Sequence, residues 1–512
     1  MTRTEPPDGP LAAALDRYEP VIGIEVHCQP RTTSKMFCGC STASDGAMPN
    51  TLVCPVCLGL PGSLPVINRR AVEAVISTGI AIGAAVPPAT RWDRKNYFYP
   101  DLPKGYQISQ YQLPLAADGR LVVDTSDGPF TVGIRRAHLE EDTAKLIHAT
   151  MPDGRRVSLV DFNRSGVPLM EIVTEPDIRT AEQARRYAEE LQLLLRAIGA
   201  SDADMERGQM RVEANVSLRR RGAAELGTRI EVKNMNSFRS VERAIGHEIE
   251  RQAAVLDAGG TLRQETRGWD DTRGVTYLMR PKEAEDDYRY FPEPDLPPLT
   301  VDARWLEAVS ARLPELPAAR RARYRDRFGL SAYDASVIVN DPGMTAAFEA
   351  ILAAGPGLPA KEVANLVTGD YSRAAKETAA RTDDGLVGSG DATELAGLIS
   401  RVVRGALSRA NAREVLLEHL ETGRSVAEIV EAQGFAQIHD TTELERIVTE
   451  VVAANPSAVA DFLAGKPQAA GFVIGQVMRA TRGQANAQVV GDLVRAQLAA
   501  AAATTGDGEG GR

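Results

Sequence analysis

The stretch Val21-Ile-Gly-Ile-Glu-Val-His27 predicts a β-strand that carries polar groups at its end. Successive side chains of a strand point to opposite faces, so Glu25 and His27 share one face. An apolar strand should not end with an inward carboxylate unless a partner holds it, and a metal ion is one such partner. The stretch therefore predicts a sheet and the start of a polar site on one of its faces.

Neighbouring stretches continue a mixed pattern of helices and strands. Residues 180–198 predict a helix that begins with a capping box at Thr180 and Gln183. Residues 211–218 and 230–233 alternate between apolar and polar side chains, and a short polar connection separates them. These two segments therefore predict a pair of hydrogen-bonded strands.

More acidic residues occur on predicted strands or at strand ends. Glu171 lies inside an apolar run, where an unpaired carboxylate is costly to bury. Several carboxylates that converge with one histidine would make an oxygen-rich site suited to Mg²⁺, although any single strand glutamate can also simply face solvent. Besides Glu25, the acidic candidates are Glu140, Glu141, Asp142, Glu171, Glu213 and Glu231.

Four of the five cysteines are grouped as Cys38-x-Cys40 and Cys54-x-x-Cys57. Two such pairs can supply four thiolates to one tetrahedral zinc ion. A site of this kind has no open coordination position, so the zinc would be structural. The alternative is four separate reduced thiols, and Cys28 fits a small buried side chain.

Cations alternate with aromatic residues in the segments 91–101 and 104–110. Such a pattern can hold phosphates and stack on a base, and Arg94 and Lys95 are the candidate phosphate contacts. A surface loop anchored by Tyr97 and Phe98 would explain the same pattern.

The chain has 512 residues and a net charge of -10, which predicts several domains and argues against nucleic-acid binding through overall charge. A local patch remains possible, because residues 462–491 contain no acidic residue but do contain Lys466, Arg479 and Arg482. Three solvated cations are the alternative. No apolar run approaches the roughly 20 residues that span a bilayer, and residues 1–20 lack a secretory signal, so we expect a soluble cytoplasmic protein.

Several common catalytic motifs are absent from the sequence, among them the P-loop, a strand followed by G-x-G-x-x-G, H-E-x-x-H and G-x-S-x-G. A metallohydrolase built on Glu25 and His27 is a rival interpretation. That class usually recruits more than one histidine, and we expect no ligand-like placement for the other five. A non-catalytic zinc-containing RNA-binding protein is a second rival, but it has little use for buried carboxylates.

Taken together, these motifs resemble the B subunits of the bacterial-type aspartyl/glutamyl-tRNA amidotransferase family. Many long motifs occur in order from about residue 20 to 500, which is more specific than any single short pattern. They are Val21-Ile-Gly-Ile-Glu-Val-His27, Ser34-Lys-Met-Phe37, Asp93-Arg-Lys-Asn-Tyr-Phe-Tyr-Pro-Asp101, Tyr106-Gln-Ile-Ser-Gln110, His138-Leu-Glu-Glu-Asp142, Glu171-Ile-Val-Thr-Glu-Pro-Asp177, Lys233-Asn-Met-Asn-Ser-Phe238, Asp286-Asp-Tyr-Arg-Tyr-Phe-Pro-Glu-Pro-Asp295, Gly471-Phe-Val-Ile-Gly-Gln-Val-Met478 and Gly483-Gln-Ala-Asn486. One departure is Ala487, where many relatives have proline.

The resemblance implies an α+β fold, with a cradle-like mixed kinase core, an all-helical domain and a small helical tail domain. The expected limits are 1–19 for a flexible N-terminal extension, 20–298 for the cradle domain with a zinc knuckle at 38–57, 299–408 for the helical domain, 409–503 for a tRNA-binding tail domain and 504–512 for a disordered tail.

The resemblance also implies ATP-dependent phosphorylation of the side-chain carboxylate of Glu-tRNA(Gln) and/or Asp-tRNA(Asn), then amidation with ammonia from a partner glutaminase. The implied partners are the amidase, which is the A subunit of such enzymes, and the small C subunit. They would form a heterotrimer that acts on misacylated tRNA and needs no membrane. The implied cofactors are ATP, Mg²⁺ and structural Zn²⁺.

The resemblance also implies which residues of this chain would take these roles. The metal and ATP site would be lined by Glu25, His27, Glu140 (or its neighbour Glu141), Glu171, Glu213 and Glu231. The nucleotide would contact Arg94, Lys95 and Lys233. The zinc ligands would be Cys38, Cys40, Cys54 and Cys57, and the tRNA contacts would be Lys466, Arg479 and Arg482.

Overall fold

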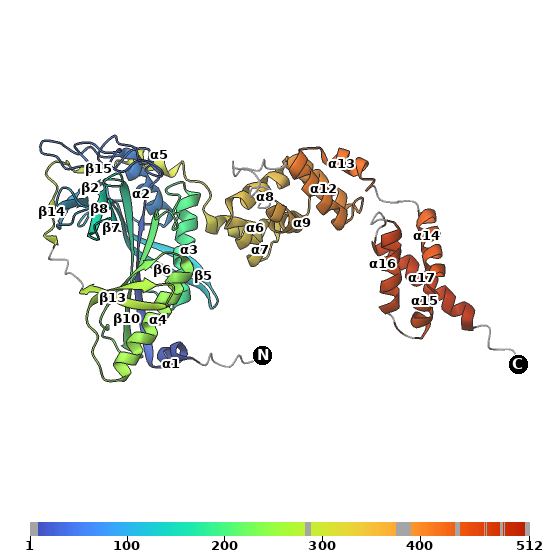
Figure 1. Ribbon diagram of the computed structural model, residues 1–512. Helices are drawn as coiled ribbons and strands as arrows, with labels where there is room; N and C mark the ends of the chain where they lie inside the picture. Colours follow the sequence, from blue (N-terminus) through green and yellow to red (C-terminus); the bar gives the residue numbers. More distant parts are fainter. Residues whose placement is uncertain are drawn as a thin grey trace. The chain divides into compact units, whose positions relative to one another are not determined.

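The computed structural model describes residues 9–281, 288–374, 391–435, 441–464, 466, 468–481, 485 and 487–506. The chain divides into two compact units, Met1–Leu316 and Pro317–Arg512. The first unit combines a large sheet with helices and the second is helical (Figure 1), which confirms the predicted α+β class.

The first unit is built on an eight-stranded sheet. Its neighbouring strands are antiparallel, apart from the parallel pair β11 and β12. In order across the sheet, the strands are β13 (Val275–Pro281), β12 (Glu265–Asp270), β11 (Ile230–Met235), β10 (Met210–Arg220), β1 (Tyr18–Cys28), β9 (Pro168–Thr174), β6 (Gly128–Glu141) and β5 (Ala116–Thr125). The predicted strand pair is confirmed, because β10 and β11 are antiparallel neighbours.

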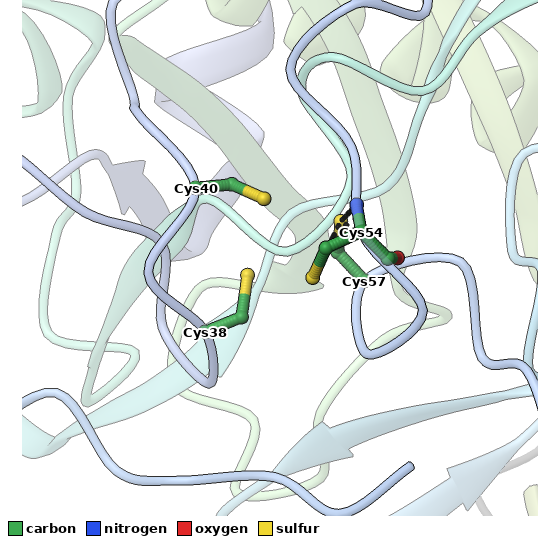
Figure 2. Close-up of side chains that lie close together, drawn as sticks. All are labelled: Cys38, Cys40, Cys54 and Cys57. Carbon is green, nitrogen blue, oxygen red and sulfur yellow. Dashed lines mark hydrogen bonds between the residues drawn. The ribbon is translucent and has the colours of Figure 1, made fainter.

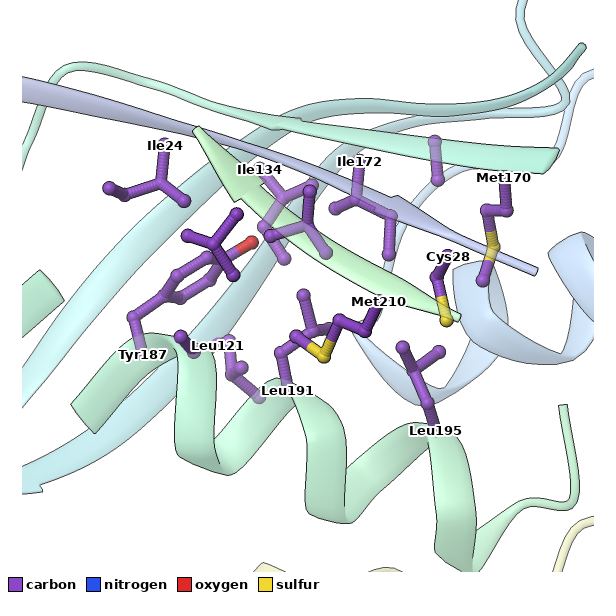
Figure 3. Close-up of a cluster of buried hydrophobic side chains, with 14 of the residues drawn as sticks. Ile24, Cys28, Leu121, Ile134, Met170, Ile172, Tyr187, Leu191, Leu195 and Met210 are labelled. Carbon is purple, nitrogen blue, oxygen red and sulfur yellow. The ribbon is translucent and has the colours of Figure 1, made fainter. Parts of the chain in front are cut away.

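One face of this sheet packs on helices α3 (Ala181–Ala197) and α4 (Phe238–Asp257). Figure 3 shows the apolar side chains between the strands and α3, among them Ile24, Ile172 and Leu191. Each aliphatic side chain buried in this way contributes roughly 1.5–3 kcal/mol to folding. The apolar side of the sheet therefore holds the unit together, and the other side is left for polar residues.

Local sequence signals explain how α3 starts. The side chain of Thr180 accepts a hydrogen bond from the backbone N–H of Gln183, and the Gln183 side chain accepts one from the backbone N–H of Thr180. This is the predicted capping box, which satisfies backbone donors that the first helical turn leaves free.

Smaller elements complete the first unit. A three-stranded sheet has the order β14 (Phe291–Pro292), β3 (Asp93–Asn96), β4 (Tyr106–Ser109). Two pairs are β15 (Leu299–Thr300) with β2 (Ala89–Thr90), and β7 (Lys145–Thr150) with β8 (Arg156–Asp161). The remaining helices are α1 (Pro10–Arg17), α2 (Arg69–Ala81) and α5 (Ala303–Ser310).

The first described elements of the chain lie within or next to the range 1–19 that was expected to form an N-terminal extension. Residues 10–17 form α1 rather than a flexible extension, and β1 already begins at Tyr18. The Tyr18 hydroxyl donates a hydrogen bond to Asp257 Oδ1 at 2.9 Å, and Arg17 forms an ion pair with the same carboxylate. These contacts attach α1 to the end of α4. Residues 1–8 lie outside the described part of the chain.

The first unit also extends beyond the expected boundary at residue 298, as far as Leu316. The reason is a buried carboxylate on α2. Glu73 accepts hydrogen bonds from Trp305 Nε1 and from Arg312 Nη2, both at 2.9 Å. These contacts tie α5 and the residues after it to the first unit.

The second unit contains two groups of helices. The first group is α6 (Pro317–Phe328), α7 (Ala332–Val339), α8 (Pro342–Ala354), α9 (Ala360–Leu366), the π-helical turn η2 (Val367–Tyr371), α11 (Ala392–Val403), α12 (Arg409–Thr422) and α13 (Val426–Ala432). The second group is α14 (Thr441–Ala454), α15 (Pro456–Leu463), α16 (Gln468–Ala480) and α17 (Ala487–Gly506), which share a separate hydrophobic cluster.

The boundary expected between residues 408 and 409 does not separate these groups. Helices α12 and α13 belong with α11, because the backbone N–H of Val426 donates to Glu394 at 2.7 Å and Arg409 forms an ion pair with Glu362 at 2.9 Å. The cluster of the tail helices instead begins at Leu444. Helix α17 extends to Gly506, and residues 507–512, which make up most of the expected tail 504–512, lie outside the described part.

Among the described residues, no helix on its own has the length and apolarity to cross a membrane. The pair α7 and α8, bent by 111°, meets the same length and composition test only when the two helices are joined.

Candidate functional site

Acidic and histidine side chains meet on the face of the large sheet opposite α3. The alternation of β1 places Glu25 and His27 on this face, while Ile24 and Val26 point into the core. Strand register then brings the other members close. His27 lies opposite Glu171 of β9, and Glu171 lies opposite His138 of β6.

His27 is at the centre of this carboxylate cluster, which we define as Glu25, His27, His138, Glu140 and Glu171. Its Nε2 atom is 3.5 Å from Glu25 Oε1, 3.5 Å from Glu171 Oε2 and 3.8 Å from Glu140 Oε1. Two overlapping triads in the cluster bring their ligand atoms close enough to share a cation. The triads are Glu25, His27 and Glu171, and His138, Glu140 and Glu171.

The electrostatics of the cluster reflect burial of several like charges. Burial and the charge of Glu171 raise the pKa of Glu25 to about 7. Burial opposes the charged form of His27, but Glu171, Glu25 and Glu213 outweigh it and raise the pKa of His27 to about 9. Burial and the charge of Glu171 also raise the pKa of Glu140. Glu25 and Glu140 therefore hold protons more tightly than usual, as expected for carboxylates that are buried beside a like charge.

Glu140, rather than Glu141, faces the cluster. These consecutive residues of β6 point to opposite sides, and Glu141 accepts a hydrogen bond from the backbone N–H of Ile108 at 2.9 Å and pairs with Lys104. Glu140 approaches His27 and accepts a weak contact from Ser109 Oγ at 3.4 Å.

Glu213 and Glu231 form a neighbouring group around a cation instead of joining either triad. Lys233 Nζ is 2.7 Å from Glu213 Oε2 and 3.8 Å from Glu231 Oε1. The hydroxyl of Thr266 donates to Glu231 at 2.6 Å. Glu213 lies directly opposite Glu25 in the sheet, so the two groups are adjacent.

The two candidate phosphate contacts on β3 have different surroundings. Arg94 donates two hydrogen bonds to Glu293, at 2.7 and 2.8 Å, and its guanidinium lies 4.1 Å from the ring centroid of Tyr106. Lys95 Nζ lies 4.9 Å from the ring centroid of Tyr288, and burial opposes its charge but Glu140, Tyr290 and Glu171 raise its pKa. Lys95 is thus placed to meet a ligand at the cluster, whereas Arg94 holds the segment after β14.

His138 was not expected in a ligand-like position, and that expectation is wrong. Its Nε2 atom is 3.5 Å from Glu171 Oε2, and burial lowers its pKa to about 4, which keeps the imidazole neutral. The spacing His138-x-Glu140 could have identified it, because it repeats the Glu25-x-His27 spacing on a second strand.

The four grouped cysteines also meet in space. Figure 2 shows Cys38 and Cys40 from one loop facing Cys54 and Cys57 from another, and their sulfur atoms lie close enough to bind one metal ion. Cys57 Sγ accepts a hydrogen bond from the backbone N–H of Cys54 at 3.1 Å. The contact with Cys38 and the nearby charge of Lys35 lower the pKa of Cys57 to about 4, so this thiolate is ready to bind a metal.

Two of the three candidate tRNA contacts lie in the described part of the C-terminal region. Lys466 is exposed and pairs with Asp461 at 2.9 Å, and Arg479 is exposed in the last turn of α16. Arg482 lies outside the described residues.

Comparisons with known proteins identify the family to which the chain is similar. Residues 20–307 match the GatB/GatE catalytic domain, and residues 346–498 match the GatB domain. The B subunit of an aspartyl/glutamyl-tRNA(Asn/Gln) amidotransferase from Moorella thermoacetica is 50% identical over 481 residues, which cover 94% of this chain and 100% of that protein. The proteins of the same description from Picosynechococcus and Thermomicrobium roseum are 46% and 49% identical, over 95% and 94% of this chain and 100% and 99% of their own lengths.

Proposed function

The chain belongs to the family of aspartyl/glutamyl-tRNA(Asn/Gln) amidotransferase B subunits, and from this we propose that it is the kinase and transamidase subunit of such an enzyme. It phosphorylates the side-chain carboxylate of Glu-tRNA(Gln), Asp-tRNA(Asn) or both, using ATP. It then joins that carboxyl carbon to ammonia that a partner glutaminase releases. It acts in a heterotrimer with the amidase (A) subunit and the small (C) subunit.

The observation that carries this proposal is the convergence of Glu25, Glu140 and Glu171 around His27 on one face of the sheet. A carboxylate is a poor electrophile because it carries a delocalised negative charge, and its oxygen is also a poor leaving group. Phosphorylation converts that oxygen into a good leaving group, and the transfer depends mainly on positioning and charge neutralisation. A buried cluster of acids next to Lys95 is suited to that task.

The cluster fits a divalent cation. Its donor atoms are carboxylate oxygens and imidazole nitrogens, and burial together with the charge of Glu171 raises the pKa values of Glu25 and Glu140, so a cation would favour their ionised forms. Residues Glu25, His27, Glu140 and Glu171 would hold Mg²⁺, with Glu213 and Glu231 adjacent. When bound, the ion supplies charge neutralisation for the phosphates. His27 would lose its proton on binding the ion through Nε2.

The chain's own cations then bind the nucleotide. The charges of Glu140 and Glu171 raise the pKa of Lys95, and Lys233 forms an ion pair with Glu213 at 2.7 Å. Both would contact ATP phosphates and leave Arg94 in its ion pairs with Glu293 and Asp295.

Two further roles complete the proposal. Cys38, Cys40, Cys54 and Cys57 would hold a structural zinc ion, because four thiolates leave no open position for catalysis. The C-terminal region would contact tRNA through Lys466, Arg479 and Arg482, and the absence of acidic residues between 462 and 491 supports this assignment.

The test uses the chain co-purified with its amidase and small partner. ATP cleavage and amide formation on misacylated tRNA are followed for the wild type, Glu171→Gln and Glu175→Gln. Glu175 is a matched control, because it follows the same strand but pairs with the exposed Arg135. We expect ATP cleavage only with charged tRNA, a loss of roughly 100-fold or more for Glu171→Gln, and near-normal activity for Glu175→Gln.

Two results would count against the proposal. Full activity of Glu171→Gln would show that Glu171 has only a structural role. A wild-type complex that never cleaves ATP in the presence of charged tRNA would show that the function itself is wrong.

A further inference from the structure

Two irregularities in strand pairing flank the carboxylate cluster, and each presents a cation to it. On β6, Ile134 pairs with Thr174 and Arg136 with the adjacent Val173, so Arg135 is an extra residue. On β11, Met235 pairs with Val212 and Val232 with Ala214, so that strand also carries an extra residue. β-bulges of this kind re-aim side chains and are common beside active sites.

The bulge on β6 decides where Arg136 points. Ile134 and Ala137 are both buried in the core, on the same side of the strand. In a regular strand, two residues on the same side are separated by one residue, but here two residues lie between them. The extra residue lets Arg136 share the face of His138 and Glu140. Arg135 turns to solvent, where it forms two hydrogen bonds with Glu175 at 2.7 and 2.9 Å.

The two cations differ in how fully they are paired. Lys233 approaches Glu213 at 2.7 Å, which is a close ion pair. The shortest ion-pair distance of Arg136 is 3.7 Å, from Nη2 to Glu171 Oε1, which is too long for a hydrogen bond. Within the described part of the chain, the Arg136 Nε atom is buried without a hydrogen-bond partner. A guanidinium in this state has donors to offer an incoming anion.

Aromatic rings border the same side chain. The Arg136 guanidinium lies 5.9 Å from the ring centroid of Tyr111. Tyr111 in turn stacks on Tyr290, with centroids 4.2 Å apart and planes within 11°. The stacked pair restricts the space that the guanidinium can occupy, yet its side chain remains 27% exposed. Arg136 is therefore both held in place and accessible.

We propose that Arg136 binds the carboxylate that is to be amidated, namely the side-chain carboxylate of the aminoacyl group on tRNA. This inference rests on the proposed function. A guanidinium matches a carboxylate with two parallel N–H donors, whereas a lysine acts on phosphate as a point charge. Lys95 and Lys233 thus bind the phosphates of ATP. Arg136 orients the side-chain carboxylate of the aminoacyl group beside Glu171. The sequence analysis did not identify Arg136, because its place on the face of His138 depends on the pairing of β6 with β9.

The experiment compares Arg136→Lys, Arg136→Gln and the control Arg135→Gln in the assembled heterotrimer. KM values for misacylated tRNA and for ATP are measured separately, together with the preference for aminoacylated over uncharged tRNA in direct binding. For Arg136→Gln we expect a roughly 10- to 150-fold loss of kcat/KM for charged tRNA, a reduced preference for charged tRNA and an unchanged KM for ATP. Arg136→Lys retains charge but not the planar fork, so it should recover only part of the loss. Arg135→Gln should behave as wild type.

The outcomes separate this inference from the function on which it rests. If the Arg136 variants raise KM for ATP and leave the preference for charged tRNA intact, the guanidinium belongs to the nucleotide and the inference is wrong. It is also wrong if neither substrate is affected while the wild type shows tRNA-dependent ATP cleavage. If the wild type lacks tRNA-dependent ATP cleavage, the result contradicts the proposed function and not only the role of Arg136. Arg136→Lys provides the comparison if Arg136→Gln does not fold.

Discussion

Glu140 and Glu141 are consecutive residues whose carboxylates lie on opposite sides of strand β6. Glu140 approaches His27 in the cluster, at 3.8 Å, and Glu141 accepts a hydrogen bond from the backbone of Ile108 and pairs with Lys104. Both are almost fully buried, so exposure does not distinguish them. The two carboxylates are distinguished by the residues that they contact.

Because of these different partners, we expect substitution of Glu140 to affect activity and substitution of Glu141 to affect stability. Glu140→Gln should leave folding intact and reduce tRNA-dependent ATP cleavage by roughly 100-fold, because it removes a charge from the cluster. Glu141→Gln should lower the free energy of unfolding by about 3 kcal/mol, because it leaves Lys104 buried without its partner. Denaturant unfolding and steady-state kinetics on both variants check this. Equal effects of the two variants on stability would contradict the assignment.

The adjacent pair Arg94 and Lys95 allows a similar comparison. Lys95→Ala should raise KM for ATP and leave the melting temperature nearly unchanged, because this side chain faces the cluster and not a structural ion pair. Arg94→Ala should mainly lower stability, by about 3 kcal/mol, because it leaves the buried Glu293 carboxylate unpaired. Nucleotide titrations and thermal unfolding separate the two effects. A nucleotide defect confined to Arg94→Ala would reverse the assignment.

Metal removal tests the cysteine cluster. The protein should contain about one zinc ion per chain, and Cys38→Ser should lose it together with more than about 4 kcal/mol of stability. Acid should also release the ion, because protons compete with the metal for thiolates. Elemental analysis and thermal unfolding measure both effects. Cys28→Ala is the control, since Cys28 lies in the core near Ser201 and should keep the zinc.

Glu73 predicts a pH dependence of stability in the first unit. Burial opposes its charged form, but hydrogen bonds from Trp305, Arg69 and Arg312 outweigh burial and lower its pKa. A carboxylate with a lowered folded-state pKa stabilises the protein above its unfolded pKa of about 4.3, and this contribution is lost as the pH falls.

Glu73→Gln should therefore cost about 1–3 kcal/mol at pH 7, and the difference from wild type should shrink below about pH 4. Urea unfolding at several pH values measures it. A difference that stays constant down to about pH 3 would show that the charge of Glu73 is not what ties α5 to α2.

Much of the fold follows from local patterns in the sequence. The alternation of residues 21–27 put Glu25 and His27 on one face, and Thr180 with Gln183 marked the start of α3. The spacing of the four cysteines predicted their cluster. These features depend on backbone geometry within a few residues, such as the two-residue period of a strand, so sequence alone determines them.

The composition of the site was decided by tertiary structure. Glu171 meets His27 and His138 because β9 lies between β1 and β6, and those strands come from segments far apart in the sequence. The same pairing distinguishes Glu140 from Glu141 and, through the extra residue Arg135, aims Arg136 at the cluster. Strand register and bulges arise from contacts between distant segments, and a change of one residue in register moves a side chain to the other face of the sheet. The sequence by itself therefore determined which residues could take part, and the packing of distant strands determined which of them meet.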